Sequence, residues 1–126
     1  MQINNFNKTI LGDNMIVFIT AKTSSPDSEV DNRFGRAAWL IRIDTENDQM
    51  EAFENQAVSQ SGGAGITTAQ FVIDHQGQVV ISGDFGPNAS SALRAAKIKM
   101  HLFTPGIQTV QQAVEAFKKE QLPSFE

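Results

Sequence analysis

The chain has 126 residues, of which 40% are hydrophobic and 19% charged, and its 10 basic and 14 acidic side chains give a net charge of −4. This length and composition are typical of one globular domain with a real core, and they exclude a largely disordered chain. The absence of cysteine excludes disulfides, thiolate zinc sites, cysteine-ligated iron–sulfur clusters and cysteine nucleophiles.

The first 14 residues are polar and rich in asparagine, and we interpret them as an N-terminal extension to a single domain over residues 15–126. Four apolar side chains in the extension could dock on that domain as an extra strand (Ile3, Phe6, Ile10 and Leu11). Residues 15–20 form an apolar, β-rich run that predicts a buried strand. The polar stretch over residues 22–32 contains turn residues and predicts a loop.

The next segments predict a hairpin. Residues 38–44 and 49–55 alternate in polarity, and the polar residues 45–48 between them are typical of a turn. In the first strand, the alternation places Trp39, Ile41 and Ile43 on one face and Leu40, Arg42 and Asp44 on the other. Two strands joined by so short a link are expected to pair antiparallel.

The second half of the chain alternates helices and strands. The predicted elements are a helix over residues 66–75, a strand over 78–82, a helix over 88–96, a strand over 98–103 and a helix after Thr109. The first of these helices shows helical spacing of its apolar residues (Ile66, Ala69, Val72 and Ile73). Pro87 suits the first turn of the second helix, where Leu93 should face inward. Thr109 and Gln112 match the capping-box pattern at the start of the last helix.

Strands that alternate with helices are expected to be parallel, with right-handed crossovers. The sequence therefore predicts an α/β fold in which a mixed sheet is flanked by helices.

Three loops of this fold are candidate ligand sites, because ligands of open α/β sheets gather at the carboxyl ends of strands, near helix N-termini. The glycine-rich loop over residues 59–65 opens one helix, residues 83–88 lie between a strand and the next helix, and residues 33–36 precede the hairpin. A helix N-terminus favours an anion, and glycines let backbone approach a ligand closely. The same glycines would also serve an ordinary tight turn, and their spacing fits neither a P-loop nor a dinucleotide fingerprint.

The side chains of the other two loops allow two interpretations each. Arg33 and Arg36 either bind an anion through forked donors or are a solvated pair beside a buried Phe34. Asp84 is either a functional carboxylate or a turn and cap residue. The candidate ligand-binding residues are Arg33, Phe34, Gly35, Arg36, Gly62, Gly63, Gly65, Asp84, Gly86, Pro87 and Asn88.

No catalytic motif accompanies these loops. His75 and His101 do not have the spacing of metal ligands, the carboxylates form no evident pair, and no serine occupies a nucleophile elbow. The residues alone therefore reveal no catalysis, and the metal ligands, if any, are unknown.

The basic side chains form no stripe of the kind that binds nucleic acid. Their densest group, Arg94, Lys97 and Lys99, is typical of a solvated helix end and strand start. The apolar run at residues 15–19 is too short for a signal peptide, and no segment is long enough to span a bilayer. We expect a soluble, cytoplasmic protein with neither nucleic acid nor membrane as a partner.

The three loops, in this order, resemble the dinitrogenase iron–molybdenum cofactor biosynthesis family of NifX and NifB C-terminal-like domains. The matching segments are residues 33–37 with Trp39 and Leu40, residues 63–65, and residues 83–89. Further matches lie in the later elements (Ala92, Leu93, Ala95, Ala96, Ile98, Val110, Ala113 and Phe117). The resemblance runs from about residue 15 to the C-terminus.

This resemblance implies a ribonuclease H-like fold with a five-stranded mixed sheet, three antiparallel strands coming first. It also implies a non-catalytic carrier of the iron–molybdenum cofactor or another metal–sulfur cluster, with a possible protein partner in cofactor assembly. Many relatives place a histidine before Phe-Gly-Arg and before Gly-Ala-Gly, where this chain has Arg33 and Gly62. Arginine attracts an anionic cluster but does not coordinate a metal.

Two alternatives to the carrier remain. One is a regulator or adaptor that has lost the cluster ligands and binds a protein partner or a small anion. The other is a nuclease, which would need Asp44, Asp74 and Asp84 to come together around two metal ions.

Overall fold

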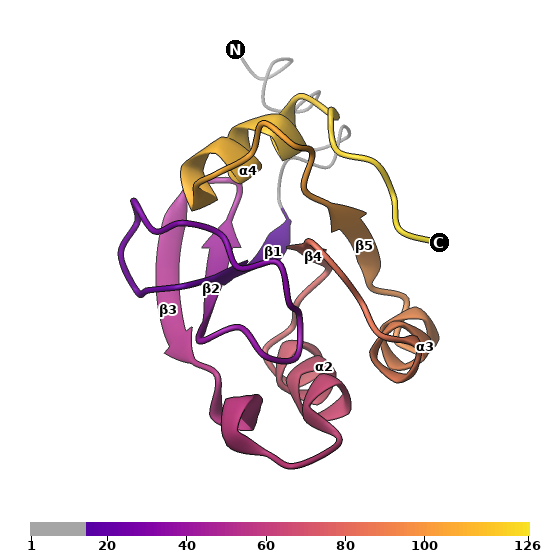
Figure 1. Ribbon diagram of the computed structural model, residues 1–126. Helices are drawn as coiled ribbons and strands as arrows, with labels where there is room; N and C mark the ends of the chain where they lie inside the picture. The colour runs from indigo at the N-terminus through magenta and orange to yellow at the C-terminus, as the bar shows by residue number, and fades with distance from the viewer. Residues whose placement is uncertain (1–14) are drawn as a thin grey trace.

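Five strands form one mixed sheet in the computed structural model, which describes residues 15–126 (Figure 1). They are β1 (Ile16–Ala21), β2 (Trp39–Asp44), β3 (Gln49–Glu54), β4 (Val79–Ser82) and β5 (Lys99–Leu102). Their order across the sheet is β3-β2-β1-β4-β5. The first three pair antiparallel, and β4 joins β1 and β5 in parallel. The predicted mixed α/β sheet is thereby confirmed, whereas the extra strand considered for the first 14 residues lies outside the described part.

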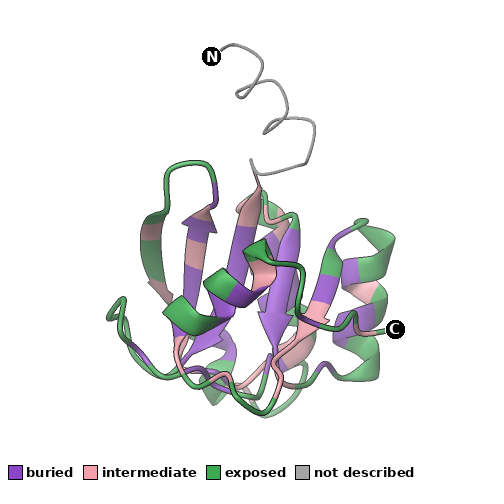
Figure 2. Cartoon of the chain, turned by 90° about the horizontal axis from the view of Figure 1, so that it is seen from above, coloured by how far each residue is buried: buried purple, intermediate pink, exposed green. Residues whose placement is uncertain are grey.

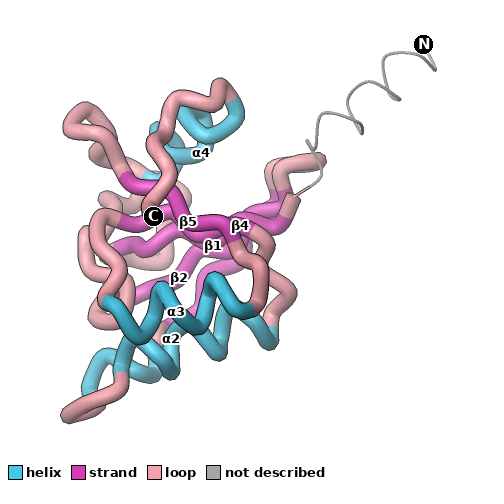
Figure 3. Tube along the Cα trace, turned by 90° about the vertical axis from the view of Figure 1, so that its right-hand side faces the viewer, coloured by secondary structure: helices cyan, strands magenta, loops and turns pink. Residues whose placement is uncertain are grey.

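Helices cover both faces of this sheet. They are α2 (Ala64–Asp74), α3 (Pro87–Ala95) and α4 (Val110–Lys118), and a short 3-10 helix, η1 (Gln56–Ser59), follows β3. Seen with the sheet edge-on, α2 and α3 lie on one side and α4 lies on the other (Figure 3). Within residues 15–126, none of these helices has the length and apolar character needed to cross a bilayer.

The strands in the middle of the sheet are buried along almost all of their length (Figure 2). Each face of the sheet has its own core, and the alternation within β2 divides its side chains between them. Ile41 and Ile43 pack with Val110 of α4, whereas Leu40 packs on the other face with Leu93 of α3. All five side chains are almost fully buried. The predicted two faces of the hairpin strand and the inward position of Leu93 are therefore confirmed.

The start of α2 differs from the prediction. The helix begins at Ala64 instead of residue 66, so Gly65 belongs to its first turn and not to the preceding loop. Of the residues with helical spacing, Ala69 and Val72 are buried, whereas Ile66 is 48% exposed. Ile66 also lies in the first turn, where it lines a pocket and faces open space instead of the sheet.

Candidate functional site

The three loops singled out in the sequence meet at one pocket of about 380 Å³. Segment 33–36, the first turn of α2 and the loop from β4 into α3 all contribute to its wall. Every predicted site residue lines this pocket except Gly62, and the structure adds Ala64, Ile66 and Ala89. Sequence reasoning missed these three because their side chains carry no polar group, and their backbone positions became relevant only once α2 and α3 were placed.

The N-terminus of α2 is open toward this pocket. Gly63 is its N-cap, with φ of 75°, a left-handed conformation that glycine adopts without strain. No side chain caps this end. The first helical bond is made by Thr67, whose N–H donates to the carbonyl of Gly63. The N–H groups of Ala64, Gly65 and Ile66 therefore have no partner within the helix and are available to a ligand.

The N-terminus of α3 has the same property. Gly86 is its N-cap and no side chain caps it, while Pro87 at the first position has no N–H to satisfy. Ser90 makes the first helical bond, to the carbonyl of Gly86, which leaves the N–H groups of Asn88 and Ala89 without a helical partner. Two helix N-termini, each with a partial positive charge, thus end at one pocket, an arrangement that favours an anion.

The third described α-helix shows that such open ends are not general in this chain. At the start of α4, the Thr109 side chain accepts a hydrogen bond from the N–H of Gln112, and the Gln112 side chain accepts one from the N–H of Thr109. The predicted capping box is confirmed. A larger hollow of about 970 Å³ lies beside α4, but its helix end is already capped and it contains none of the predicted site residues.

Glycines hold the three loops in contact. A Cβ on Gly35 would come within 2.8 Å of the backbone nitrogen of Gly65, and one on Gly65 would lie 3.1 Å from the Cβ of Ala89. Similarly, a Cβ on Gly83 would lie 2.8 Å from the Cα of Asn32. Real Cβ atoms do not fit at the shortest of these distances. The wall of the pocket is therefore built by backbone segments that touch directly.

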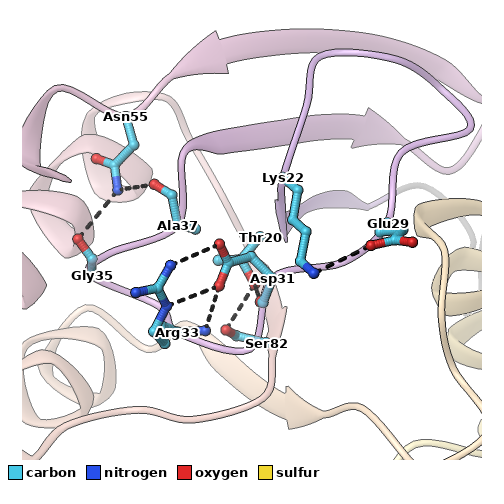
Figure 4. Close-up of polar contacts among 9 residues, drawn as sticks. All are labelled: Thr20, Lys22, Glu29, Asp31, Arg33, Gly35, Ala37, Asn55 and Ser82. Atoms are coloured by element: carbon cyan, nitrogen blue, oxygen red, sulfur yellow. Dashed lines mark hydrogen bonds and ion pairs between the residues drawn. The ribbon is translucent and has the colours of Figure 1, made fainter.

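The two arginines have different surroundings, and Figure 4 shows those of Arg33. Arg33 lies beside the buried Asp31, with Nε 3.3 Å from Oδ1 and Nη2 3.4 Å from Oδ2, and its side chain is 68% exposed. Arg36 donates from Nη1 to the backbone carbonyls of Val58 (2.9 Å) and Gln60 (2.6 Å). Arg33 is thus a loosely held cation at the rim of the pocket, whereas Arg36 ties the end of η1 and the residue after it to the pocket wall.

The remaining side chains at the pocket divide into buried and exposed. Phe34 lines the pocket, but its ring is buried and lies 5.3 Å between centroids from the buried ring of Phe85, so Phe34 offers the pocket mainly backbone. Asp84 and Asn88 are exposed, and among the described residues neither side chain has a hydrogen-bond partner. Asp84 does not cap α3, because no side chain does. The Asn88 amide can therefore donate to an anion, whereas the Asp84 carboxylate only accepts hydrogen bonds and opposes the positive charge of the helix ends.

The side chains at the pocket are poorly suited to coordinate a soft metal. They offer guanidinium groups, one carboxylate and one amide, with neither imidazole nor thiolate. Over residues 15–126, no three His, Cys, Asp or Glu side chains form a group that could hold a metal ion, so Asp44, Asp74 and Asp84 do not assemble a two-metal site there. His75 and His101 each bond a backbone carbonyl outside the pocket.

Comparison with known proteins gives one family. The family model described as dinitrogenase iron-molybdenum cofactor matches residues 15–120. The apo form of the orange protein from Desulfovibrio gigas is 37% identical to this chain, with a TM-score of 0.83. The match covers 89% of this chain and 93% of that one. A candidate NifB protein from Thermotoga, solved by NMR, is 30% identical, with a TM-score of 0.76. That match covers 87% of this chain and 92% of the other.

A candidate dinitrogenase from Methanocaldococcus jannaschii has the same fold at 11% identity, with a TM-score of 0.67 over 90% of this chain and 96% of that one. No curated protein matches the chain.

Proposed function

Because the chain belongs to the dinitrogenase iron–molybdenum cofactor family, we propose that it is a non-catalytic carrier that holds an anionic metal–sulfur cluster. The cargo would be the iron–molybdenum cofactor, a precursor of it or a related cluster. It would bind at the pocket where α2 and α3 begin.

One observation carries this proposal, namely the meeting of two uncapped helix N-termini at a single pocket. The free N–H groups of both first turns supply fixed hydrogen-bond donors, which need no reorganisation when an anion arrives. Arg33 at the rim adds a full positive charge, and its bonds to Asp31 are long enough, at 3.3 and 3.4 Å, for an anion to compete with them.

The donor set decides how the cargo would be held. Sulfide-rich clusters carry negative charge and accept hydrogen bonds, which matches N–H groups and guanidinium. The pocket lacks the imidazole and thiolate side chains that soft metals prefer. We therefore infer that the protein binds its cargo by hydrogen bonds and charge, without a covalent bond to metal, so that the cluster stays transferable.

A single substitution tests this mode of binding. Gly86→Asp would give α3 its own cap, because φ of −69° and ψ of 165° suit an N-cap aspartate and a Cβ there meets nothing within 4 Å. The carboxylate would occupy the N–H groups of Asn88 and Ala89 and repel an anion. We expect the free energy of unfolding to stay equal or to rise by about 0.5 kcal/mol, while binding is lost.

Binding is measured by anaerobic incubation with isolated iron–molybdenum cofactor, gel filtration and metal analysis, and by titration with tetrathiomolybdate. Gly106→Asp is the matched control, since it adds the same charge at a glycine with open space that lies outside the pocket. If neither iron nor molybdenum elutes with the unsubstituted protein, the carrier proposal is wrong. If Gly86→Asp binds as well as the control, the helix N-termini do not hold the cargo.

The second candidate is a regulator or adaptor that keeps this fold and binds a protein partner or a small anion. The pocket without imidazole or thiolate favours it, because such a pocket also suits an anion that contains no metal. Affinity purification from native lysate separates the two candidates. A stoichiometric partner protein without metal supports the adaptor, and co-purified molybdenum or iron supports the carrier.

We also propose a fold label, a domain organisation and a cellular location. The strand order β3-β2-β1-β4-β5 supports the ribonuclease H-like label. The match over residues 15–120 supports a single domain after a short extension. A role in cofactor assembly supports a location of the protein in the cytoplasm.

A further inference from the structure

The chain ends in a strap, residues 122–126, that runs along the outer edge of β5 (Figure 1). The N–H of Phe125 donates to the carbonyl of Met100 (3.0 Å), and the N–H of Leu102 donates to the carbonyl of Pro123 (2.9 Å). Ser124 forms an antiparallel bridge with His101. The strap thus pairs with an edge that would otherwise be open, and it lies beyond residues 15–120, where the family match ends.

Three further contacts hold the strap in place. Leu122 is buried, and its carbonyl accepts a hydrogen bond from Nδ1 of His101 at 3.0 Å. Arg94 of α3 donates from Nη2 to the carbonyl of Glu126 at 2.9 Å. The third contact is the ring of Phe125, which joins the core on the α2 and α3 face of the sheet.

The ring of Phe125 begins a row of aromatic side chains that leads to the pocket. Its centroid lies 5.2 Å from that of Phe85, and Phe85 lies 5.3 Å from Phe34. Phe85 and Phe34 are 4% and 2% exposed. Phe34 lines the pocket, and Phe85 lies in the chain between Asp84 and Gly86, which also line it. The strap therefore touches, through one ring, the loop that leads into α3.

The loop that leads into α3 has few buried side chains to hold it in place. Of residues 84–88, only Phe85 is buried, and the other four are exposed. Its ring is thus the anchor of the loop, placed between Phe34 on one side and Phe125 on the other. Removing one neighbour of a buried ring leaves a cavity and lets the ring move. Segments with few buried contacts are the first to open locally.

We propose that the strap sets the geometry of the pocket, with Phe125 as a positioning residue that holds the N-terminus of α3 against segment 33–36. The proposal rests on the proposed function in one respect, that the pocket binds an anion. Attachment of the strap and binding of the anion are then linked, and linkage is reciprocal: releasing the strap weakens binding by the same factor by which the anion secures the strap. A carrier gains from this a way to release cargo when a partner lifts the strap.

The substitution Phe125→Ala tests the proposal, with Phe117→Ala as the matched control. Phe117 is also half-buried, but it belongs to the core on the α4 face. Hydrogen exchange is measured in the ligand-free protein at two equivalent amides. Ser90 donates to the N-cap carbonyl of Gly86 in α3, and Ala113 donates to that of Thr109 in α4. The affinity for tetrathiomolybdate is measured separately.

We expect Phe125→Ala to speed exchange at Ser90 roughly fivefold or more and to weaken tetrathiomolybdate binding by a similar factor, with Ala113 unchanged. Phe117→Ala should leave Ser90 and the affinity unchanged, and Phe125→Leu should restore most of both. Unchanged exchange at Ser90, or an equal rise at Ser90 and Ala113, overturns the proposal. Because exchange is measured without ligand, this result holds even if no anion binds, an outcome that would instead contradict the proposed function.

Discussion

Gly35 and Gly65 touch backbone to backbone, and this contact joins segment 33–36 to the first turn of α2. A Cβ on Gly35 would lie 2.8 Å from the nitrogen and 2.9 Å from the Cα of Gly65, so only glycine fits at position 35 without a shift. The atoms that it would meet are backbone atoms of a helix, which cannot rotate away. The contact therefore fixes where the open end of α2 stands relative to Arg33 and Arg36.

The first prediction is that Gly35→Ala lowers the free energy of unfolding by about 1–3 kcal/mol, the usual cost of overpacking. The added methyl group has to push α2 away from segment 33–36, which also opens the pocket. Urea denaturation measures the effect. Gly62→Ala is the control, because a Cβ at Gly62 meets nothing within 4 Å. A change for Gly35→Ala as small as that of the control would show that the two segments separate freely.

The second prediction concerns Asn55, which is 3% exposed and whose side chain bonds segment 35–37 (Figure 4), η1 and Thr68 of α2. Its Nδ2 donates to the carbonyls of Ala37 (2.9 Å) and Gly35 (3.3 Å), and its Oδ1 accepts from the N–H of Ala57. Asn55→Ala would leave the two carbonyls and the N–H group buried without these partners, and each buried group without a partner costs up to about 3 kcal/mol. We expect the free energy of unfolding to fall by about 2–4 kcal/mol.

Asn47→Ala makes the same chemical change at an exposed turn residue whose Oδ1 accepts from the N–H of Gln49. Its effect should stay below about 1 kcal/mol. Thermal or urea unfolding followed by circular dichroism compares the two variants directly. Equal effects would mean that water replaces the lost partners at Asn55.

The third prediction separates Arg36 from Arg33. Arg36 donates to the carbonyls of Val58 in η1 and of Gln60 directly after it, so Arg36→Ala should free the end of η1 and lower the free energy of unfolding by about 1 kcal/mol. The freed segment should be cleaved faster by a nonspecific protease near residues 58–61, which mass spectrometry locates. Arg33→Ala is the control and should leave that cleavage rate unchanged. Equal cleavage in both variants would show that Arg36 does not hold the segment.

Much of the fold follows from local patterns. Residues close together in the sequence predict the apolar strand β1, the hairpin and the Thr109–Gln112 capping box. The structure contains all three features. The three loops follow β1, β3 and β4, which run in the same direction and therefore place their carboxyl ends at one edge of the sheet, where ligands of such sheets gather. These features depend on short sequence distances or on a general rule of topology.

What could not be predicted depends on contacts between distant residues. Arg36 donates to backbone carbonyls that lie 22 and 24 residues further along the chain, and no local sequence pattern predicts these bonds. The pairing of the strap with β5 was equally hidden, since residues 122–126 have no strand pattern of their own. The helical spacing of Ile66 does not reveal that the first turn of α2 lies beside an open pocket.

The last prediction is that Arg33→Ala weakens binding of tetrathiomolybdate without destabilising the fold. The guanidinium is 68% exposed, so its ion pair with Asp31 contributes less than about 1 kcal/mol after solvent screening. Asp31 also keeps the hydrogen bond that it accepts from the backbone N–H of residue 33, at 3.0 Å. A full charge at the rim of an anion pocket should nevertheless be worth about tenfold in affinity at low salt.

That difference in affinity should shrink as salt is added, because the screening length falls from about 30 Å at 0.01 M to about 3 Å at 1 M. Titrations at both ionic strengths therefore separate charge from contact. Lys22→Ala is the matched control, since Lys22 forms a comparable exposed pair with Glu29 but does not line the pocket. A loss of affinity that is equal at both ionic strengths, or shared by Lys22→Ala, would contradict a direct electrostatic role for Arg33.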